Sequence, residues 1–120
     1  MSRDYRLFLD DIQESCAKIL RYTQGLSFEQ FVSDDKTFDA VVRNLAIVGE
    51  AVKHVPEPVR LRFPEVDWHK ISGMRDILVY EYFGIDEDIL WDIIQHQVPT
   101  LAERVERILA EVAASANTDD

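Results

Sequence analysis

The sequence predicts an all-α protein, an antiparallel up-and-down bundle of four main helices joined by short helices. Three observations carry this prediction. Apolar residues recur at spacings of three and four in four long segments, no segment keeps a period-two alternation, and most connections between the long segments are short. With 120 residues, 47% of them hydrophobic, we expect one helical domain over residues 1–113 and a flexible polar tail over residues 114–120.

The first two helices are expected over residues 4–23 and 27–32. Gly25 is well placed to end the first of them, because helices often stop at a glycine in the left-handed conformation. Ser27 and Gln30 have the spacing of a capping box, which predicts where the second helix begins. The stripe that makes the first segment amphipathic consists of Phe8, Ile12, Cys16, Ile19 and Leu20.

The third helix is expected over residues 37–54, after a turn at residues 34–36, and only Gly49 interrupts its apolar stripe. A glycine inside a helix costs about 1 kcal/mol relative to alanine, so the close approach of a neighbouring helix would explain it. The connector that follows contains three prolines and has room for one helical turn at residues 59–63. The stripe of the third helix consists of Phe38, Val41, Val42, Leu45, Val48 and Val52.

Two more long helices complete the predicted bundle. Asp67 is a suitable N-cap for a helix over residues 68–83, and after Gly84 a second acid, Asp86, caps the last helix. Pro99 should kink that last helix, because proline lacks the amide donor and crowds the preceding turn. The core positions expected on the two helices are Ile71, Met74, Ile77 and Leu78, then Leu90, Ile94, Val98, Leu101, Val105, Ile108, Leu109 and Val112.

A net charge of −10 narrows the classes of function. It argues against nonspecific binding of nucleic acid over the whole surface, because that affinity comes mostly from lysine and arginine on phosphates. It leaves room for a small basic cleft, and it would suit a basic protein partner. No apolar run is long enough to span a membrane or to form a signal peptide, so we expect a cytoplasmic protein with no membrane partner.

No metal site and no cofactor are expected. Cys16 is the only cysteine, and its place in an apolar stripe favours a buried, inert thiol over a nucleophile. The three histidines, His54, His69 and His96, are too scattered to form a recognisable metal motif, although a fold could gather them.

Residues 73–86 form the most informative segment of the chain. They place Arg75, Tyr80 and Tyr82 in one short helical stretch. At about 100° per residue, Arg75 and Tyr82 project from nearly the same face, and Tyr80 lies about 140° round from Arg75. A guanidinium beside phenolic oxygens suits an anionic ligand such as phosphate. The structural alternative is that Arg75 pairs with a carboxylate and the tyrosines are packing residues.

Several segments of the chain match one known family. They are YTQGLSFEQF at residues 22–31, RNLAIVGEAVK at residues 43–53, Phe63-Pro64 with Trp68, GMRDILV at residues 73–79 and YFGID at residues 82–86. The chain therefore resembles the HepT-like family of the HEPN superfamily, whose members are small helical bundles. Because the match covers nearly the whole chain, the resemblance predicts one HEPN-like domain.

The resemblance implies a toxin of a type VII toxin-antitoxin pair, a metal-independent endoribonuclease that acts on RNA as a homodimer. The partner it implies is a minimal nucleotidyltransferase antitoxin. The family signature is an arginine, four intervening residues, a histidine, any residue and a tyrosine. By position the arginine is Arg75, and the tyrosine is Tyr82, which is also the implied AMP acceptor. Asp76 would hold the Arg75 guanidinium in place, or would be a solvated surface acid.

The chain departs from this signature at Tyr80, which stands where the family has its histidine. A phenol with an ordinary pKa of about 10 is a poor general base at pH 7, and losing a general base commonly slows a reaction about a hundredfold to ten-thousandfold. We therefore expect weakened or lost nuclease activity, whether Tyr80 is natural or introduced. The third explanation of Tyr80 is a phenol that does altered chemistry, which needs a strongly lowered tyrosine pKa. The alternative function is a non-catalytic nucleotide-binding module that partners a nucleotidyltransferase, and the structural alternative is an oligomerising bundle.

Large aromatic residues around the motif helix favour a dimer, because a bundle of this size need not bury so many by itself. Packing within one protomer would explain some of them equally well. These residues are Trp68, Tyr80, Tyr82, Phe83 and Trp91.

Overall fold

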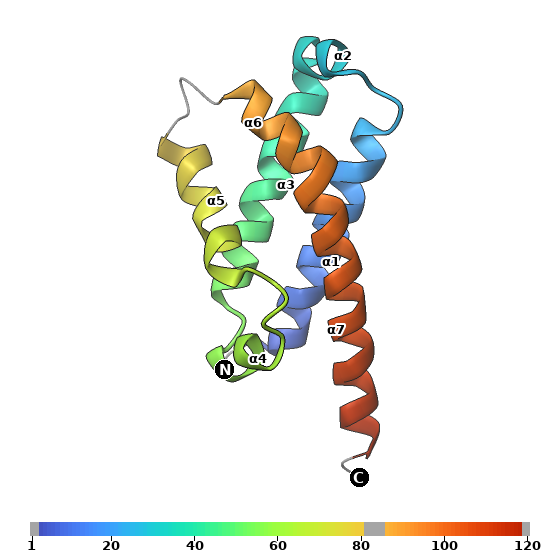
Figure 1. Ribbon diagram of the computed structural model, residues 1–120, viewed down its shortest axis with the longest axis vertical. Coiled ribbons are helices and arrows are strands. Elements are labelled where there is room, and N and C mark those ends of the chain that lie inside the picture. Colours follow the sequence, from blue (N-terminus) through green and yellow to red (C-terminus); the bar gives the residue numbers. More distant parts are fainter. Residues whose placement is uncertain (1–2, 81–85, 119–120) are drawn as a thin grey trace.

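The structure is a computed structural model. It describes the backbone of residues 3–80 and 86–118 and the side chains of residues 3–74 and 86–115. All regular structure within these ranges is helical, which confirms the all-α prediction. Figure 1 shows that the main helices run alternately up and down, in the order α1 (Tyr5–Thr23), α3 (Asp35–Lys53), α5 (Trp68–Tyr80) and α7 (Val98–Thr118).

The main helices pack as a series of neighbours. Helix α1 packs against both α3 and α7, and α3 also packs against α5. The described parts of α5 and α7 make little direct contact with each other, so the bundle is open between them. Figure 1 shows α5 and α7 on opposite sides of the molecule, with α3 and α1 between them in that view.

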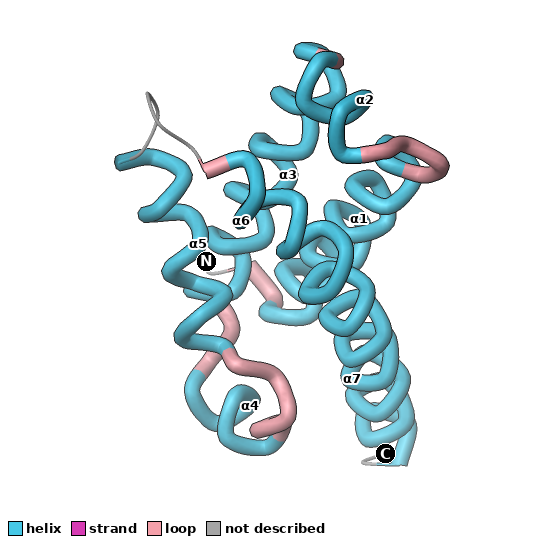
Figure 2. The backbone as a smooth tube through the Cα atoms, turned by 45° about the horizontal axis from the view of Figure 1, so that its top comes forward, coloured by secondary structure: helices cyan, strands magenta, loops and turns pink. Residues whose placement is uncertain are grey.

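The core is built from the apolar stripes that the sequence predicts. The connection between α4 (Glu57–Arg62) and α5, drawn as a loop in Figure 2, is held by two side-chain donors to backbone carbonyls. Trp68 Nε1 donates to the Phe63 carbonyl at 3.0 Å, and Arg104 Nη1 donates to the Glu65 carbonyl at 2.5 Å. The residues of the core that have only 0 to 1% of their surface exposed include Leu9, Ile12, Ile19, Val41, Leu45, Val48, Val52, Ile94, Val105 and Ile108.

The first two helices begin and end within one residue of the predicted positions. Gly25 has a φ of 77°, in the left-handed region that favours glycine, just after α1 ends. Helix α2 (Phe28–Ser33) has the predicted capping box at its start. Ser27 Oγ accepts from the Gln30 amide at 3.2 Å, and Gln30 Oε1 accepts from the Ser27 amide at 2.9 Å. Two amide donors that the helix leaves free are thereby satisfied.

Replacing Ser27 by alanine is expected to destabilise the protein by about 1 kcal/mol, because the capping hydroxyl is lost. The measurement is urea unfolding followed by circular dichroism. Ser33→Ala is the matched control, since the Ser33 hydroxyl donates to the Glu29 carbonyl within α2 and caps nothing. Equal losses in the two variants would show that the capping box adds no stability.

Helix α3 begins earlier than the sequence analysis placed it. The predicted turn at residues 34–36 was wrong, because Asp35 and Lys36 already belong to α3 and Asp34 is its N-cap. Asp34 accepts from the Thr37 amide at 3.2 Å and from the Thr37 hydroxyl at 2.8 Å. Gly49 lies on the buried side of α3, as a position of close helix packing should.

The single turn predicted at residues 59–63 is a longer helix, α4 (Glu57–Arg62). It begins before the predicted position because Pro58 occupies the first turn, where a missing amide donor does no harm. Phe63, the last residue of the predicted turn, is the C-cap of α4.

The last long helix is interrupted in a way that the sequence analysis did not specify. Asp86 caps α6 (Glu87–Asp92) as predicted, accepting from the Asp88 and Ile89 amides at 3.0 and 3.1 Å. A wide π-helical turn, η1 (Ile93–Gln97), then precedes Pro99, which has no amide to donate back into that turn. Helix α7 continues to Thr118. The flexibility of residues 114–120 stays a prediction.

Candidate functional site

The structure places three of the predicted site residues on one helix. Arg75, Asp76 and Tyr80 lie in the C-terminal half of α5, so the predicted helical backbone is confirmed there. The side chains of residues 75–80 lie outside the described part of the structure, and so does Tyr82 altogether. The mutual geometry of the guanidinium and the two phenols therefore stays a prediction.

The N-terminal half of α5 is described in full and fixes how the helix sits. Asp67 Oδ1 accepts from the Lys70 amide at 3.1 Å, which confirms Asp67 as the N-cap. Ile71 and Met74 are buried as predicted, at 7 and 6% exposure. Met74 lines the opening between α5 and α7. Arg75 is the next residue along α5, so it lies directly beside that opening in the sequence.

That opening forms a groove of about 220 Å³, called here the α5–α7 groove. Its floor comes from the α1 and α3 side of the bundle, with Cys16, Leu45 and Val48. Met74 and Leu101 stand on opposite walls, from α5 and α7. The groove is concave and mostly apolar, which is the usual character of a small-ligand site.

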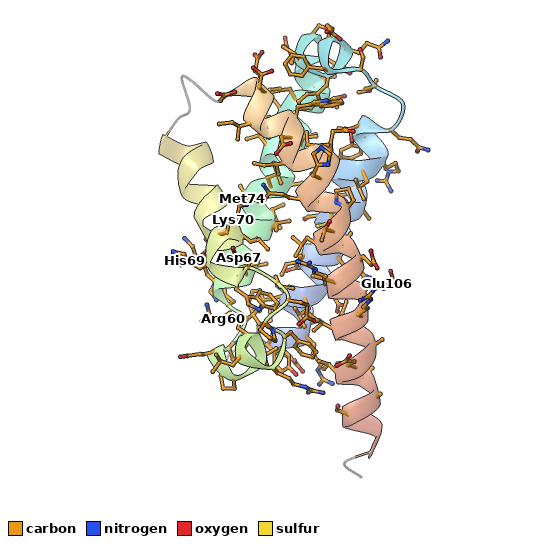
Figure 3. The ribbon with its side chains drawn as sticks, in the orientation of Figure 1. Arg60, Asp67, His69, Lys70, Met74 and Glu106 are labelled. Atoms are coloured by element: carbon orange, nitrogen blue, oxygen red, sulfur yellow. The ribbon has the colours of Figure 1, made fainter. Side chains whose placement is uncertain are left out.

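Charged residues lie at the edge of the α5–α7 groove. Lys70 and Arg104 bring positive charge from its two walls, and Asp67 is the carboxylate that lines it. Figure 3 labels Asp67, Lys70 and Met74 along α5. His96, from η1, also lines the groove, with Nε2 3.7 Å from a carboxylate oxygen of Asp92.

A second hollow continues the groove towards α6 and shares Lys70, Met74 and Gln97 with it. Its acidic residues are Asp88 and Asp92. The two hollows that meet at Lys70 therefore differ in the sign of their net charge. The side towards α7 has a positive balance, and the side towards α6 is acidic.

Cys16 forms part of the groove floor but has no nucleophilic chemistry there. Burial raises the pKa of its thiol to about 12, so the thiolate is negligible near neutral pH. The prediction of a buried, inert thiol is confirmed.

The histidines lie on separate elements of the described structure. His54 stacks on Phe8, with ring centroids 4.6 Å apart, whereas His69 is on α5 and His96 on η1. Among the described residues, no three or more His, Cys, Asp and Glu side chains gather in a way that could hold a metal ion. No helix in the same ranges is long and apolar enough to cross a membrane.

Sequence reasoning missed that Lys70 and Arg104 line the same groove. They lie on different helices, and no spacing along the chain connects them. Only the packing of α5 and α7 on either side of the α1–α3 pair brings both to one groove. No motif could have indicated this pair in advance.

Comparison with known proteins gives the chain its family. A family model described as "Ribonuclease HepT-like" matches residues 12–108, which is most of the chain and includes every residue that lines the groove. The chain belongs to the HepT-like ribonuclease family. The resemblance drawn from the segments around Arg43 and Arg75 is thereby confirmed.

Individual relatives of this HepT-like protein agree over nearly their whole length. A candidate RNase of Methanocaldococcus jannaschii is 39% identical over 110 residues, covering 92% of this chain and 91% of the relative. One from Caldanaerobacter subterraneus subsp. tengcongensis is 41% identical, covering 87 and 93%. A protein of Thermococcus cleftensis named "Probable ribonuclease HepT" is 37% identical, covering 90 and 98%. No solved structure matches this HepT-like chain.

Proposed function

We propose that this chain is a HepT-like toxin of a type VII toxin-antitoxin pair, built on the scaffold of a metal-independent endoribonuclease. One observation carries the proposal. In a chain of the HepT-like ribonuclease family, α5 presents Arg75 and Tyr80 at the signature spacing, and Tyr82 follows at its own signature position. Two signature residues are retained, and Tyr80 replaces the histidine.

The chemistry assigns a role to each retained residue. Arg75 would hold the scissile phosphate and stabilise the charge that develops on it, because a guanidinium offers fixed donors and stays ionised. The 2′-hydroxyl of the ribose would lose its proton to a base and attack that phosphate. The P–O5′ bond to the next nucleotide would break, and the 5′-oxygen would leave as a hydroxyl after taking up a proton, so that a 2′,3′-cyclic phosphate forms without metal or water. Asp76 would support Arg75. The attack needs a base, and the phenol of Tyr80 is a poor one, so the activity of this chain is weakened or lost.

A homodimer belongs to the proposal, with the two signatures facing each other across the dimer axis. The aromatic residues support it less than the sequence analysis expected. Trp68 is buried within the protomer and bonded to Phe63, and the Trp91 ring lies 5.3 Å from that of Phe31. Support for the dimer therefore comes from the family resemblance.

The experiment is to incubate RNA with the purified protein, and separately with its Tyr80→His variant, in the presence of a chelator. Cleavage by the variant alone supports an impaired nuclease. If both proteins leave RNA intact while remaining folded, the nuclease proposal fails.

The proposed partner is a minimal nucleotidyltransferase antitoxin, which would transfer AMP to the Tyr82 phenol. We expect incubation with ATP and that enzyme to add the mass of one AMP to the chain, and Tyr82→Phe to abolish the addition. Adding AMP there would fill the site with bulk and negative charge. Peptide mass spectrometry locates the modification, and AMP on the Tyr82→Phe chain would contradict the assignment.

A second candidate is a non-catalytic nucleotide-binding module that partners the same kind of enzyme. Tyr80 favours it, and so does the net charge of −10, which is unfavourable for holding long RNA. AMP on Tyr82 in a chain whose Tyr80→His variant cuts no RNA would select this candidate.

A further inference from the structure

We infer that the α5–α7 groove binds one nucleotide of a single-stranded RNA. The base would lie against the apolar floor, and the adjoining phosphate would lie between Lys70 and Arg104. The inference rests on the proposed function for its ligand class, and it adds a binding subsite that the signature residues do not supply.

The shape of the groove suits a single ring system. Its floor consists of the aliphatic side chains of Leu45 and Val48, both 1% exposed, with Leu101 on the α7 wall at 6%. A volume of about 220 Å³ is below the roughly 300 Å³ at which pockets for drug-sized ligands begin. We expect a pocket of this size to accommodate one planar base. Apolar walls favour contact with the flat aromatic face of a base, and all bases offer such a face.

The charge at the rim suits a phosphate. Lys70 is exposed, and among the described residues its ammonium has no carboxylate partner. The Arg104 guanidinium is held in position by its bond from Nη1 to the Glu65 carbonyl, which leaves further donors for a ligand. Asp67 is the opposing charge, and its Oδ1 already accepts from the Lys70 amide. The groove therefore has a positive balance on a chain whose net charge is −10.

The groove also adjoins the part of α5 that carries the proposed catalytic residues. Lys70 and Met74 line it, and Arg75 is the next residue along α5. Five residues of helix separate Lys70 from Arg75 by about 7.5 Å along the axis, which a strand can cross in about one nucleotide step. A nucleotide in the groove would thus place its neighbour beside the turn of α5 that carries Arg75.

The test compares two charge reversals that alter the net charge equally, Lys70→Glu and Lys36→Glu. Each lysine is exposed and lies in the first turn of its helix, where glutamate is favourable, so both variants should fold. Binding is measured by fluorescence anisotropy with a short labelled single-stranded RNA in the presence of a chelator. We expect Lys70→Glu to weaken binding about tenfold and to reduce the salt dependence by about 0.7 in log-log slope, and Lys36→Glu to change affinity less than about twofold.

A second ligand tests the apolar floor. An abasic strand of the same length should bind more weakly than the RNA, because it has phosphates but no base to fill the groove. Equal binding of the two strands would overturn the inference, as would equal effects of the two reversals. A change in oligomeric state on Lys70→Glu with unaltered RNA affinity would make the groove a protein contact, and this also overturns it.

These outcomes are separable from failure of the proposed function. Groove binding is measured without cleavage, so a chain that binds RNA as expected but stays inert as Tyr80→His contradicts only the nuclease proposal. A Tyr80→His variant that cuts RNA, with binding unaffected by Lys70→Glu, contradicts only the groove.

Discussion

Tyr80→His is expected to cleave RNA about a hundredfold to ten-thousandfold faster than the unaltered chain, because it restores a general base to the HepT-like signature. Imidazole ionises near pH 6.5 and can accept the proton of a ribose 2′-hydroxyl at neutral pH, whereas a phenol ordinarily ionises near pH 10. The rate should rise as the pH passes about 6.5, since the neutral imidazole is the active form. The measurement is the initial rate on a labelled RNA, with chelator present, across a pH series.

Arg75→Ala in the Tyr80→His background is the control. It should remove the gained activity, because the scissile phosphate would lose its fixed cation. Activity that survives this second change, or that disappears with the chelator, would mean that the gain came from a contaminating nuclease. Circular dichroism of the three proteins shows whether the total helical content has been kept.

Phe31→Ala is expected to destabilise the protein by about 3–5 kcal/mol, the usual loss when a fully buried phenylalanine is truncated. Phe31 is 0% exposed and joins three helices at one end of the bundle. Its ring centroid lies 5.4 Å from that of Phe38 on α3 and 5.3 Å from that of Trp91 on α6. Truncation leaves a cavity and removes two aromatic contacts at once. Urea unfolding followed by tryptophan fluorescence measures the loss.

Phe28→Ala is the matched control, since Phe28 is on the same short helix, is only half-buried and contacts the same tryptophan at 6.1 Å. We expect it to cost less than half as much free energy of unfolding. If the two variants were equally destabilised, burial of Phe31 would not be what holds α2 to α3 and α6.

Sequence reasoning succeeded where the determinants are local. The caps Ser27, Asp67 and Asp86 and the glycine after α1 mark helix ends, because the groups they satisfy lie within four residues. It failed where a local signal had two interpretations. Asp34 was assigned to a turn although it caps α3. The kink at Pro99 stays a prediction, and the π-helical turn just before it was not foreseen.

By itself the sequence determined the helical class, the stripes that form the core and the HepT-like family, and it predicted that Tyr80 stands at the position of the signature histidine. These depend on periodicity and spacing, which are read along one chain. Only the tertiary structure decided that α5 and α7 stand apart on the α1–α3 pair and leave a groove with Lys70 and Arg104 at its edge. The physical reason is that a groove depends on which helix faces pack together. For helices distant in sequence, this packing is set by the total apolar surface that whole faces bury against one another.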